Sequence, residues 1–254
     1  MSGLGALLRR ELLEQWRTYR LVVVLVVFAV IGIISPLTAF YINELLAALG
    51  GEGLRITLPT PTTADAVAQL IKNVGQMGAF IAVLVTMGSV VTEKERGTAA
   101  MILTKPATRT AFLAAKIVAI GLLLAAGVAL AFVLAAAYTA VLFEPLPVAG
   151  VVAGGVLVWL SLVDLAAITF LASTVAPSAI VAGGVGIAAL LGSWTLSVLP
   201  GLGQWLPTGL WGIAGDMLSG RSPAVDPAGP LLLNAGLVVL CLVGAVAAFR
   251  RQEL

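Results

Sequence analysis

The sequence predicts an all-α integral membrane protein that crosses the bilayer six times. Of its 254 residues, 60% are hydrophobic and 10% are charged, whereas a soluble domain carries about 25% charged residues. The mean hydropathy is +1.11. A membrane-spanning helix needs about 20 mostly apolar residues, and six such stretches occur. Residues 1–254 therefore form a single transmembrane domain, with too little chain outside the spans for a second, catalytic domain.

The six spans are identified by their length and by the absence of charge. They are expected at residues 21–43, 74–91, 117–143, 149–175, 179–199 and 231–249. Only three residues separate the fourth span from the fifth, so a single long helix is an alternative there. Pro177 lies in this gap, and two spans are predicted because proline lacks an amide hydrogen and breaks helices.

The positions of lysine and arginine predict the orientation of the chain. Basic residues near the ends of spans stay on the cytoplasmic side of the membrane. Eleven of the 14 basic residues lie in segments 1–20 and 92–116 and after residue 249. The alternate connections carry more acidic than basic residues. Both termini are therefore predicted to be cytoplasmic, which agrees with an even number of spans.

The composition excludes several classes of chemistry. The chain contains no histidine, which removes serine–histidine nucleophile pairs, histidine-ligated zinc and the usual proton shuttle at physiological pH. Cys241 is the single cysteine, so neither a disulfide within the chain nor a cysteine metal cluster is expected. Outside the membrane-proximal segments the sequence contains no basic stripe with interleaved aromatic residues, so nothing in it indicates nucleic-acid binding. We expect no enzyme activity, no metal and no cofactor in this chain.

The N-terminal segment, residues 1–20, is expected to form an amphipathic helix on the membrane surface. Apolar side chains recur there every three or four residues, which is typical of a helix with one apolar face. They are Leu4, Leu8, Leu12, Trp16 and Tyr19. The alternative is a charged flank that sets the orientation of the first span and has no further role.

Two external segments are too long to be simple turns. In residues 44–73, three glycines and two prolines predict an irregular first half, after which Thr63 or Asp65 caps a short helix. We expect this helix to lie on the outer membrane surface and then turn into the second span, as a spacer or as a contact for substrate. Residues 200–230 contain five prolines, seven glycines and two tryptophans, which predicts short interfacial or re-entrant pieces.

The cytoplasmic loop at residues 92–116 contains seven charged residues. Charged side chains end the second span in water, and Gly97 breaks that helix. A short helix is expected to begin at Thr98 and to end at Leu103, before Pro106 stops it. Held between two spans, such a helix would transmit force from a soluble partner. The alternative is a loop that is only solvated.

Two sequence strings in these segments resemble a known family. The loop reads E-K-E-R-G-T at residues 93–98 and I-L-T-K-P-A-T-R at residues 102–109, and a lysine opens the third span. It resembles the first cytoplasmic loop of ABC transporter permeases of the type-2 permease class, which have the type V exporter architecture. The string R-R-E-L-L-E-Q-W-R at residues 9–17 resembles the elbow helix of the same family.

The resemblance implies a permease subunit that forms the translocation pathway as a homodimer or heterodimer in a bacterial plasma membrane. Separate ATPase subunits at the cytoplasmic face would hold ATP and Mg, and the motif G-x-x-x-x-G-K-[ST] is absent from this sequence. The short helix after Gly97 would dock on the ATPase, supported by the elbow helix. The residues implied in this contact are Glu93, Glu95, Arg96, Gly97, Thr98, Leu103, Pro106 and Arg109 in the loop and Arg10, Glu11, Glu14, Trp16 and Arg17 in the elbow helix.

The sequence departs from the family in two places. Ala115 stands before Lys116 where glycine is common in the family, which is a mild change for close helix packing. The external segment before the second span is longer than in many relatives, which argues against a simple assignment as a lipid exporter. The transported substrate stays open.

Two features within the spans are further candidates. Asp164 lies near the middle of the fourth span, where a charge costs about 2.5 to 3.5 kcal/mol. It either belongs to the substrate pathway, or carries a proton, or is a neutral carboxyl that is hydrogen-bonded to Ser161 or to a neighbouring span. Gly184, Ala188 and Gly192 recur every four residues and would let helices approach closely. The resemblance implies that spans one and five line the dimer interface.

Other functions remain open at this point. A proton-coupled secondary transporter that uses Asp164 would need no ATPase. A non-transporting membrane component of a sensory or assembly complex would bind an ATPase without moving a substrate. A membrane-embedded enzyme is the weakest alternative, because the sequence offers no cluster of metal ligands and no pair of nucleophile and base.

Overall fold

The computed structural model describes residues 3–49, 59–97, 108–199 and 201–251, and this part of the chain is helical without strands. Six stretches are long and apolar enough to cross a membrane, which confirms the predicted fold class. They are α2 (Arg20–Phe40), α4 (Thr63–Met87) continued by α5 (Val91–Glu95), α7 (Arg109–Leu142), α8 (Val148–Val175), α9 (Ala179–Leu196) and α11 (Ala228–Arg250).

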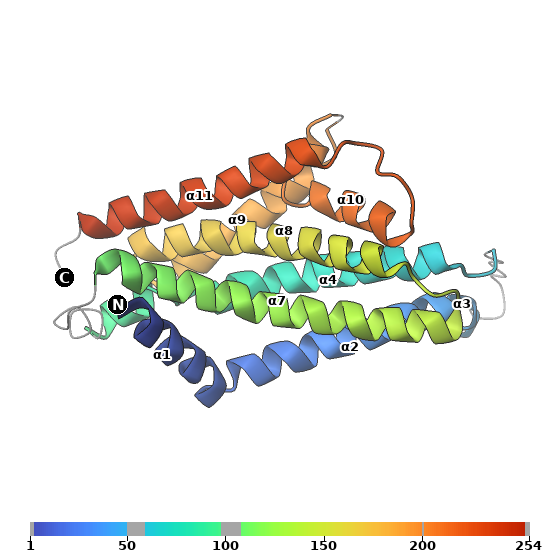
Figure 1. Ribbon diagram of the computed structural model, residues 1–254, viewed down its shortest axis with the longest axis horizontal. Coiled ribbons are helices and arrows are strands. Elements are labelled where there is room, and N and C mark those ends of the chain that lie inside the picture. Colours follow the sequence, from blue (N-terminus) through green and yellow to red (C-terminus); the bar gives the residue numbers. More distant parts are fainter. Residues whose placement is uncertain (1–2, 50–58, 98–107, 200, 252–254) are drawn as a thin grey trace.

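The six long helices run along the long axis of one bundle, and the shorter helices lie at its two ends (Figure 1). Helix α1 (Gly3–Arg17) lies at the end where α11 finishes, so the first and last described residues are at the same end. Helix α3 (Ile42–Leu49) lies at the opposite end. The segments on either side of residues 98–107 are at the end that carries the two termini.

Helices α2 and α7 are held together by small residues that let their backbones meet. Phe28 is fully buried, and an added Cβ at Gly127 would lie 2.7 Å from its ring. An added Cβ at Gly32 would lie 2.5 Å from the carbonyl oxygen of Ala131. Because any larger side chain would separate the two backbones, these glycines fix how closely α2 packs on α7.

Helix α4 differs from the sequence prediction at its start. The prediction of a surface helix that turns into the second span is wrong, because α4 runs without interruption from Thr63 to Met87. Its N-terminus is fixed by a capping box in which the Thr62 backbone amide donates to Asp65 Oδ2 at 2.8 Å. Val67 and Val74 are buried in the first part of the helix, and Gly78 and Ala82 are buried further along it. One continuous apolar face thus supports a single long helix.

The segment between α9 and α11 forms the 3-10 helix η2 (Gly203–Trp205) and the helix α10 (Gly209–Leu218). Helix α10 packs on α8 and α4, and its Leu210 and Leu218 are fully buried. The Trp211 indole Nε1 donates to Ser161 Oγ on α8 at 2.8 Å. Gly154 on α8 makes room for Leu218. This segment is therefore packed into the bundle rather than solvated.

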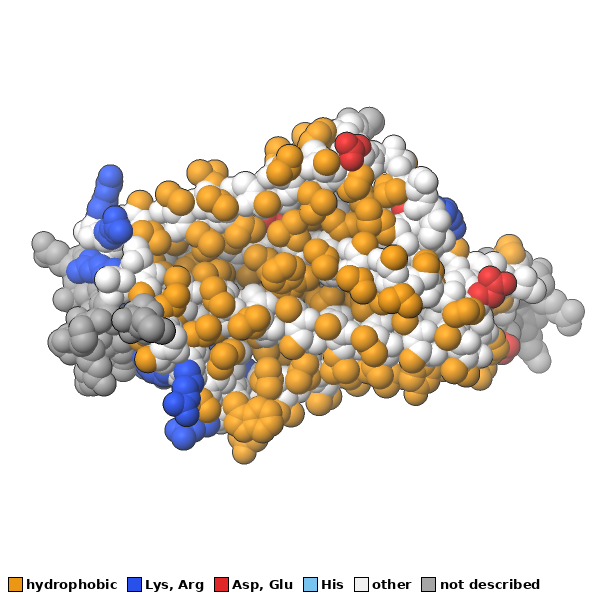
Figure 2. Space-filling view, in the orientation of Figure 1, with side chains coloured by type: hydrophobic (Ala, Val, Ile, Leu, Met, Phe, Trp, Pro, Cys, Tyr) orange, Lys and Arg blue, Asp and Glu red, His pale blue; other side chains and the backbone are white. Residues whose placement is uncertain are grey.

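Charged and apolar side chains are separated along the bundle. The visible face of the long helices is mainly hydrophobic, and lysine and arginine gather at the end that carries α1 and the two termini (Figure 2). Acidic side chains are visible toward the other end (Figure 2). This distribution gives an apolar belt with a basic end, as expected for a membrane protein whose basic side faces the cytoplasm.

Candidate functional site

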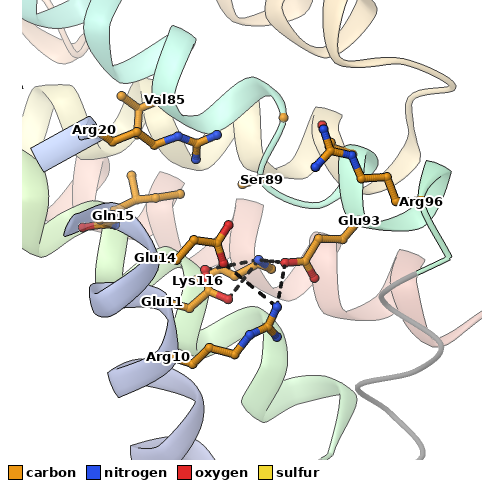
Figure 3. A pocket seen from close by; sticks show the side chains of 13 residues that line it. Arg10, Glu11, Glu14, Gln15, Arg20, Val85, Ser89, Glu93, Arg96 and Lys116 are labelled. Carbon is orange, nitrogen blue, oxygen red and sulfur yellow. Dashed lines mark hydrogen bonds and ion pairs between the residues drawn. The ribbon is translucent and has the colours of Figure 1, made fainter. Parts of the chain in front are cut away.

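The basic end of the bundle contains a buried lysine that joins three helices. Lys116, in the first third of α7, has only 4% of its side chain exposed. Its Nζ donates to Glu11 of α1 at 3.0 and 3.2 Å, and to Glu93 of α5 at 2.8 Å (Figure 3). A lysine is rarely buried unless it is paired. Lys116 therefore links α1, α5 and α7 through charge-assisted hydrogen bonds.

Arg10 adds a second cation to this cluster. Its Nη2 lies 3.7 Å from Glu93 Oε1 and 4.0 Å from Glu14 Oε2. Burial raises the pKa of the Glu11 carboxyl above its ordinary value, and the nearby Lys116 opposes that rise. One oxygen from each of Glu11, Glu14 and Glu93 lies within 4.8 Å of the others. The Lys116 ammonium is the cation that these acidic side chains surround in Figure 3.

Helix α5 is also anchored to the end of α8. The backbone amides of Val90 and Val91 both donate to Ser173 Oγ at 3.2 Å. Lys94 Nζ donates to the carbonyl oxygen of Thr174 at 2.8 Å. Carbonyl groups in the last turn of a helix lack partners within that helix, so Lys94 caps α8. The chain that leads into residue 98 is thereby fixed to α8.

The chain that follows residue 107 is anchored in the same way to α11. Thr108 caps α7, because its Oγ1 accepts from the Ala111 amide at 3.1 Å. Arg109 Nη1 donates to the carbonyl oxygens of Phe249 at 3.0 Å and Arg250 at 3.2 Å, in the last turn of α11. Segment 98–107 is therefore flanked on both sides by residues that hold the ends of other helices.

A pocket of about 230 Å³ lies beside the lysine cluster (Figure 3). It is enclosed by α1, the start of α2, the end of α4, α5 and α7. Its polar lining residues are Arg10, Glu11, Glu14, Gln15, Arg20, Ser89, Thr92, Glu93, Arg96 and Lys116. Charged side chains from three segments that are distant in the sequence thus share one space.

The structure brings together some of the residues that the sequence singled out for the cytoplasmic contact. Those that line the pocket are Arg10, Glu11, Glu14, Glu93 and Arg96. Glu95 and Arg17 are exposed, and Trp16 is 61% exposed on α1. Gly97 has a φ of 67°, a left-handed conformation suited to glycine at a helix end. Thr98, Leu103 and Pro106 lie outside the described residues, and with them the expected short helix.

Sequence reasoning gave too small a role to two lysines. Lys116 was expected only to anchor the return of the chain into the third span, and Lys94 only to help end the second span in water. A signal was present for Lys116, because it interrupts the apolar run from Ala111 to Ile120, and a charge in such a run needs a buried partner. Nothing in the sequence identified that partner as Glu11, 105 residues away.

Asp164 lies inside the subunit. Its side chain is fully buried on α8, and neither carboxyl oxygen has a hydrogen-bond partner among the described residues. The Ser161 hydroxyl donates instead to the carbonyl oxygen of Val158 and accepts from Trp211. Cys241 on α11 lies close enough to interact electrostatically with Asp164. The carboxyl is thus positioned where α8 packs on α11.

The three small residues on α9 lie on its outward face. Gly184 and Ala188 are exposed, Gly192 is partly exposed, and no atom lies within 4 Å of a Cβ added at either glycine. The opposite face, with Gly186 and Leu190, is buried. Helix α9 packs on α4 and α8. The small-residue face is therefore open to a partner within the membrane.

Six long apolar helices, a basic end and a buried charged cluster define a polytopic membrane protein. Comparison with known proteins agrees with this class. The model of the family described as "ABC-2 family transporter protein" matches residues 6–202. The chain therefore belongs to the ABC-2 transporter family, as the loop and elbow strings predicted.

A relative from Bacillus subtilis (strain 168) is similar over its full length. It is described as "Uncharacterized transmembrane protein YxlG", and it is 27% identical over 261 residues. The alignment covers 100% of this chain and 99% of the relative. The similarity therefore extends from the N-terminal helix to α11, beyond the part that the family model matches.

Proposed function

We propose that this chain is the permease subunit of an ATP-binding cassette exporter in a bacterial plasma membrane. Two permease subunits form the translocation pathway, and separate ATPase subunits bind at the end of the bundle that carries Lys116. The observation that carries this proposal is the anchoring of the described residues on both sides of segment 98–107. On one side Lys94 holds α8 and Glu93 meets Lys116, and on the other side Arg109 holds α11.

This anchoring supports mechanical coupling. A partner that displaces segment 98–107 pulls on α5 and on the start of α7, and through their polar contacts on α1, α8 and α11. A partner shifts a conformational equilibrium only by contacting the two states differently. We assign the direct contact to Glu95, which is exposed, and to the residues that follow from Thr98 to Leu103. ATP and Mg are held by the ATPase partner.

The second permease subunit packs on the outward face of α9. Gly184, Ala188 and Gly192 would allow close approach of two helix backbones, as small residues do in other membrane interfaces. Helices α2 and α9 both pack on α4. The family resemblance, which implies an interface of spans one and five, agrees with this assignment.

A proton-coupled transporter is the second candidate, and the buried carboxyl of Asp164 is the observation that favours it. Asp164 lacks a hydrogen-bond partner among the described residues, which suits a group that exchanges a proton. Such a transporter would work without an ATPase. The anchored loop favours the exporter, because a secondary transporter has no need for a coupling contact.

The test is to purify the protein gently from native membranes and to identify its partners by mass spectrometry. We expect a stoichiometric ATPase with a nucleotide-binding motif. The variant Glu95→Lys is expected to lower the ATPase activity of the complex about tenfold, equivalent to about 1.4 kcal/mol. Glu44→Lys, an equally exposed reversal near α3 at the other end, is the matched control.

Two results would contradict the proposal. One is the absence of any ATPase from preparations in which the permease dimer is preserved. The other is an equal effect of the Glu95 and Glu44 reversals. Either result would make proton-coupled transport through Asp164 the next hypothesis, with Asp164→Asn as its first variant.

A further inference from the structure

Two arginines in the pocket beside Lys116 have no described partner. Arg20 begins α2 and Arg96 ends α5, and both line the pocket of about 230 Å³. No hydrogen bond or ion pair joins either side chain to a residue that the structure describes. Figure 3 shows the two guanidinium groups directed toward each other across the pocket. Two cations that face one space repel each other unless an anion lies between them.

Two of the four cations that line the pocket are already paired with its carboxylates. Lys116 bonds to Glu11 and Glu93, and Arg10 lies near Glu93 and Glu14. The pocket is lined by four cations and three carboxylates. The set therefore carries one net positive charge, and Arg20 and Arg96 are its two cations without a carboxylate partner among the described residues.

Uncharged polar groups complete the same wall. Ser89 Oγ is buried without a hydrogen-bond partner among the described residues, and so is Oε1 of Gln15, whose side chain is 7% exposed. Both residues line the pocket. The Ser89 hydroxyl can donate to an anion, and buried polar groups are rarely left unpaired. The unpaired Gln15 oxygen is an acceptor, so it is not a partner for an anion. A ligand with several acceptor oxygens would satisfy the Ser89 hydroxyl and both arginines together.

The pocket lies where lipid headgroups are expected. Helix α1 carries Trp16, which is 61% exposed, and the following turn carries Tyr19, which is 71% exposed. Exposed tryptophan and tyrosine favour the membrane interface. Tyr19 has a left-handed backbone, with a φ of 58°, at the turn that places α1 across the start of α2. Arg20 thus lies between an interfacial helix and the apolar belt.

We propose that this pocket binds the phosphate of an anionic phospholipid, held by Arg20 and Arg96 with Ser89. Anionic lipids gather in the cytoplasmic leaflet and attract basic residues there. The pocket is far larger than the roughly 15 Å³ that one water molecule requires. The bound lipid would connect α1, α2 and α5 and thereby stabilise the position of α1 next to the lysine cluster. This inference does not depend on the identity of the transported substrate.

The experiment measures the lipid that stays bound to the detergent-purified, full-length protein. The protein is incubated with an equal mixture of phosphatidylglycerol and phosphatidylcholine, diluted in salt to remove diffuse attraction, and analysed by native mass spectrometry. Wild type is expected to retain phosphatidylglycerol in preference to phosphatidylcholine. The double variant Arg20→Gln/Arg96→Gln is expected to retain about tenfold less, equivalent to about 1.4 kcal/mol, because both cations of the site are removed.

Matched variants separate a defined site from general charge. Arg9→Gln/Arg17→Gln removes the same charge from the surface of α1, and neither residue lines this pocket; retention is expected to stay within about twofold. Ser89→Ala keeps every charge and is expected to lower retention about threefold through one lost hydrogen bond. It also serves if the double variant does not fold.

Three results would overturn the proposal. The first is equal loss in the two double variants, which would indicate attraction without a site. The second is complete displacement of phosphatidylglycerol by inorganic phosphate, which would assign the pocket to a free anion. The third is unchanged lipid retention together with loss of the ATPase partner in Arg20→Gln/Arg96→Gln, which would assign these arginines to a protein contact.

Discussion

At the scale of single residues, Lys116 determines whether the charged end is stable. Its ammonium is nearly fully buried and lies between Glu11 and Glu93. Removing one member of a buried ion pair leaves its partners buried and uncompensated, which costs more than the intact pair contributes. Without Lys116, the carboxylates of Glu11 on α1 and Glu93 on α5 would lie close together with no ammonium group between them.

The variant Lys116→Gln is therefore expected to lower the free energy of unfolding by about 3 kcal/mol. Thermal unfolding of the purified protein in detergent measures the effect. Lys72→Gln is the matched control, because Lys72 is exposed on α4, and a shift below about 0.5 kcal/mol is expected for it. Equal shifts in the two variants would show that Lys116 has no special structural role.

The residue types of this site were visible in the sequence, and their pairing was not. The loop string identified Glu93 and Arg96, and the elbow string identified Glu11 and Glu14. Their meeting point at Lys116 depends on how α1 lies across α7, which is a tertiary contact that periodicity does not report. The same limit applies to Arg20 and Ser89, which carry no local motif at all.

At the scale of helices, α9 differs from the others in what it exposes. Its inner face packs on α4 and α8, and its outer face presents small residues at intervals of four. Leu, Ile or Val at these positions would suffice for contact with lipid. A row of small side chains on a membrane helix favours contact with another helix, because the two backbones can approach closely and increase their van der Waals packing.

Cysteine cross-linking tests this interface. In a Cys241→Ala background, Ala188→Cys is expected to give a disulfide-linked dimer on mild oxidation in native membranes, because the two copies of α9 would meet there. Val239→Cys is the control, since Val239 is 60% exposed on α11. The yield of dimer is read on a non-reducing gel. A dimer from Val239→Cys without one from Ala188→Cys would contradict the assignment.

The sequence predicted the helices correctly where a long apolar run alone determines that the segment is helical. A long apolar run must form a helix in a bilayer, because every backbone polar group has to be satisfied within the segment. The start of α4 was missed because the spans were identified by the absence of charge, and Asp65 and Lys72 precede the second predicted span. Both residues belong to the same helix, in which Gln69 and Asn73 also bond to each other at 3.2 Å. One buried apolar stripe therefore runs through the polar start of α4 as well as through its apolar remainder.

At the scale of the whole molecule, the bundle has two chemically different ends. The described termini and the segments flanking residues 98–107 lie at the basic end, and α3 and α10 lie at the other (Figure 1). The charge distribution of the sequence predicts that the basic end is cytoplasmic. The fold places the predicted cytoplasmic segments together, and it leaves the direction of insertion to be measured.

Labelling of single cysteines in intact cells measures that direction. In the Cys241→Ala background, Ser222→Cys, between α10 and α11, is expected to react with a membrane-impermeant thiol reagent. Ser178→Cys, between α8 and α9 at the opposite end, is expected to react only after the cells are permeabilised. Both positions are accessible in the structure, since Ser222 is exposed and Ser178 is partly exposed. The reverse pattern would show that the basic end faces outward.

The contact of Arg109 with the end of α11 also bears on the order in which the protein is made. Arg109 bonds to carbonyl oxygens that lie 140 and 141 residues later in the chain. Domains begin to fold while the ribosome is still adding residues, so a nascent chain that has produced α7 has no acceptor for this arginine. The loop is anchored on its second side only when α11 is complete. Chains that stop early would therefore insert their first spans and still lack the contact that holds the start of α7 to α11.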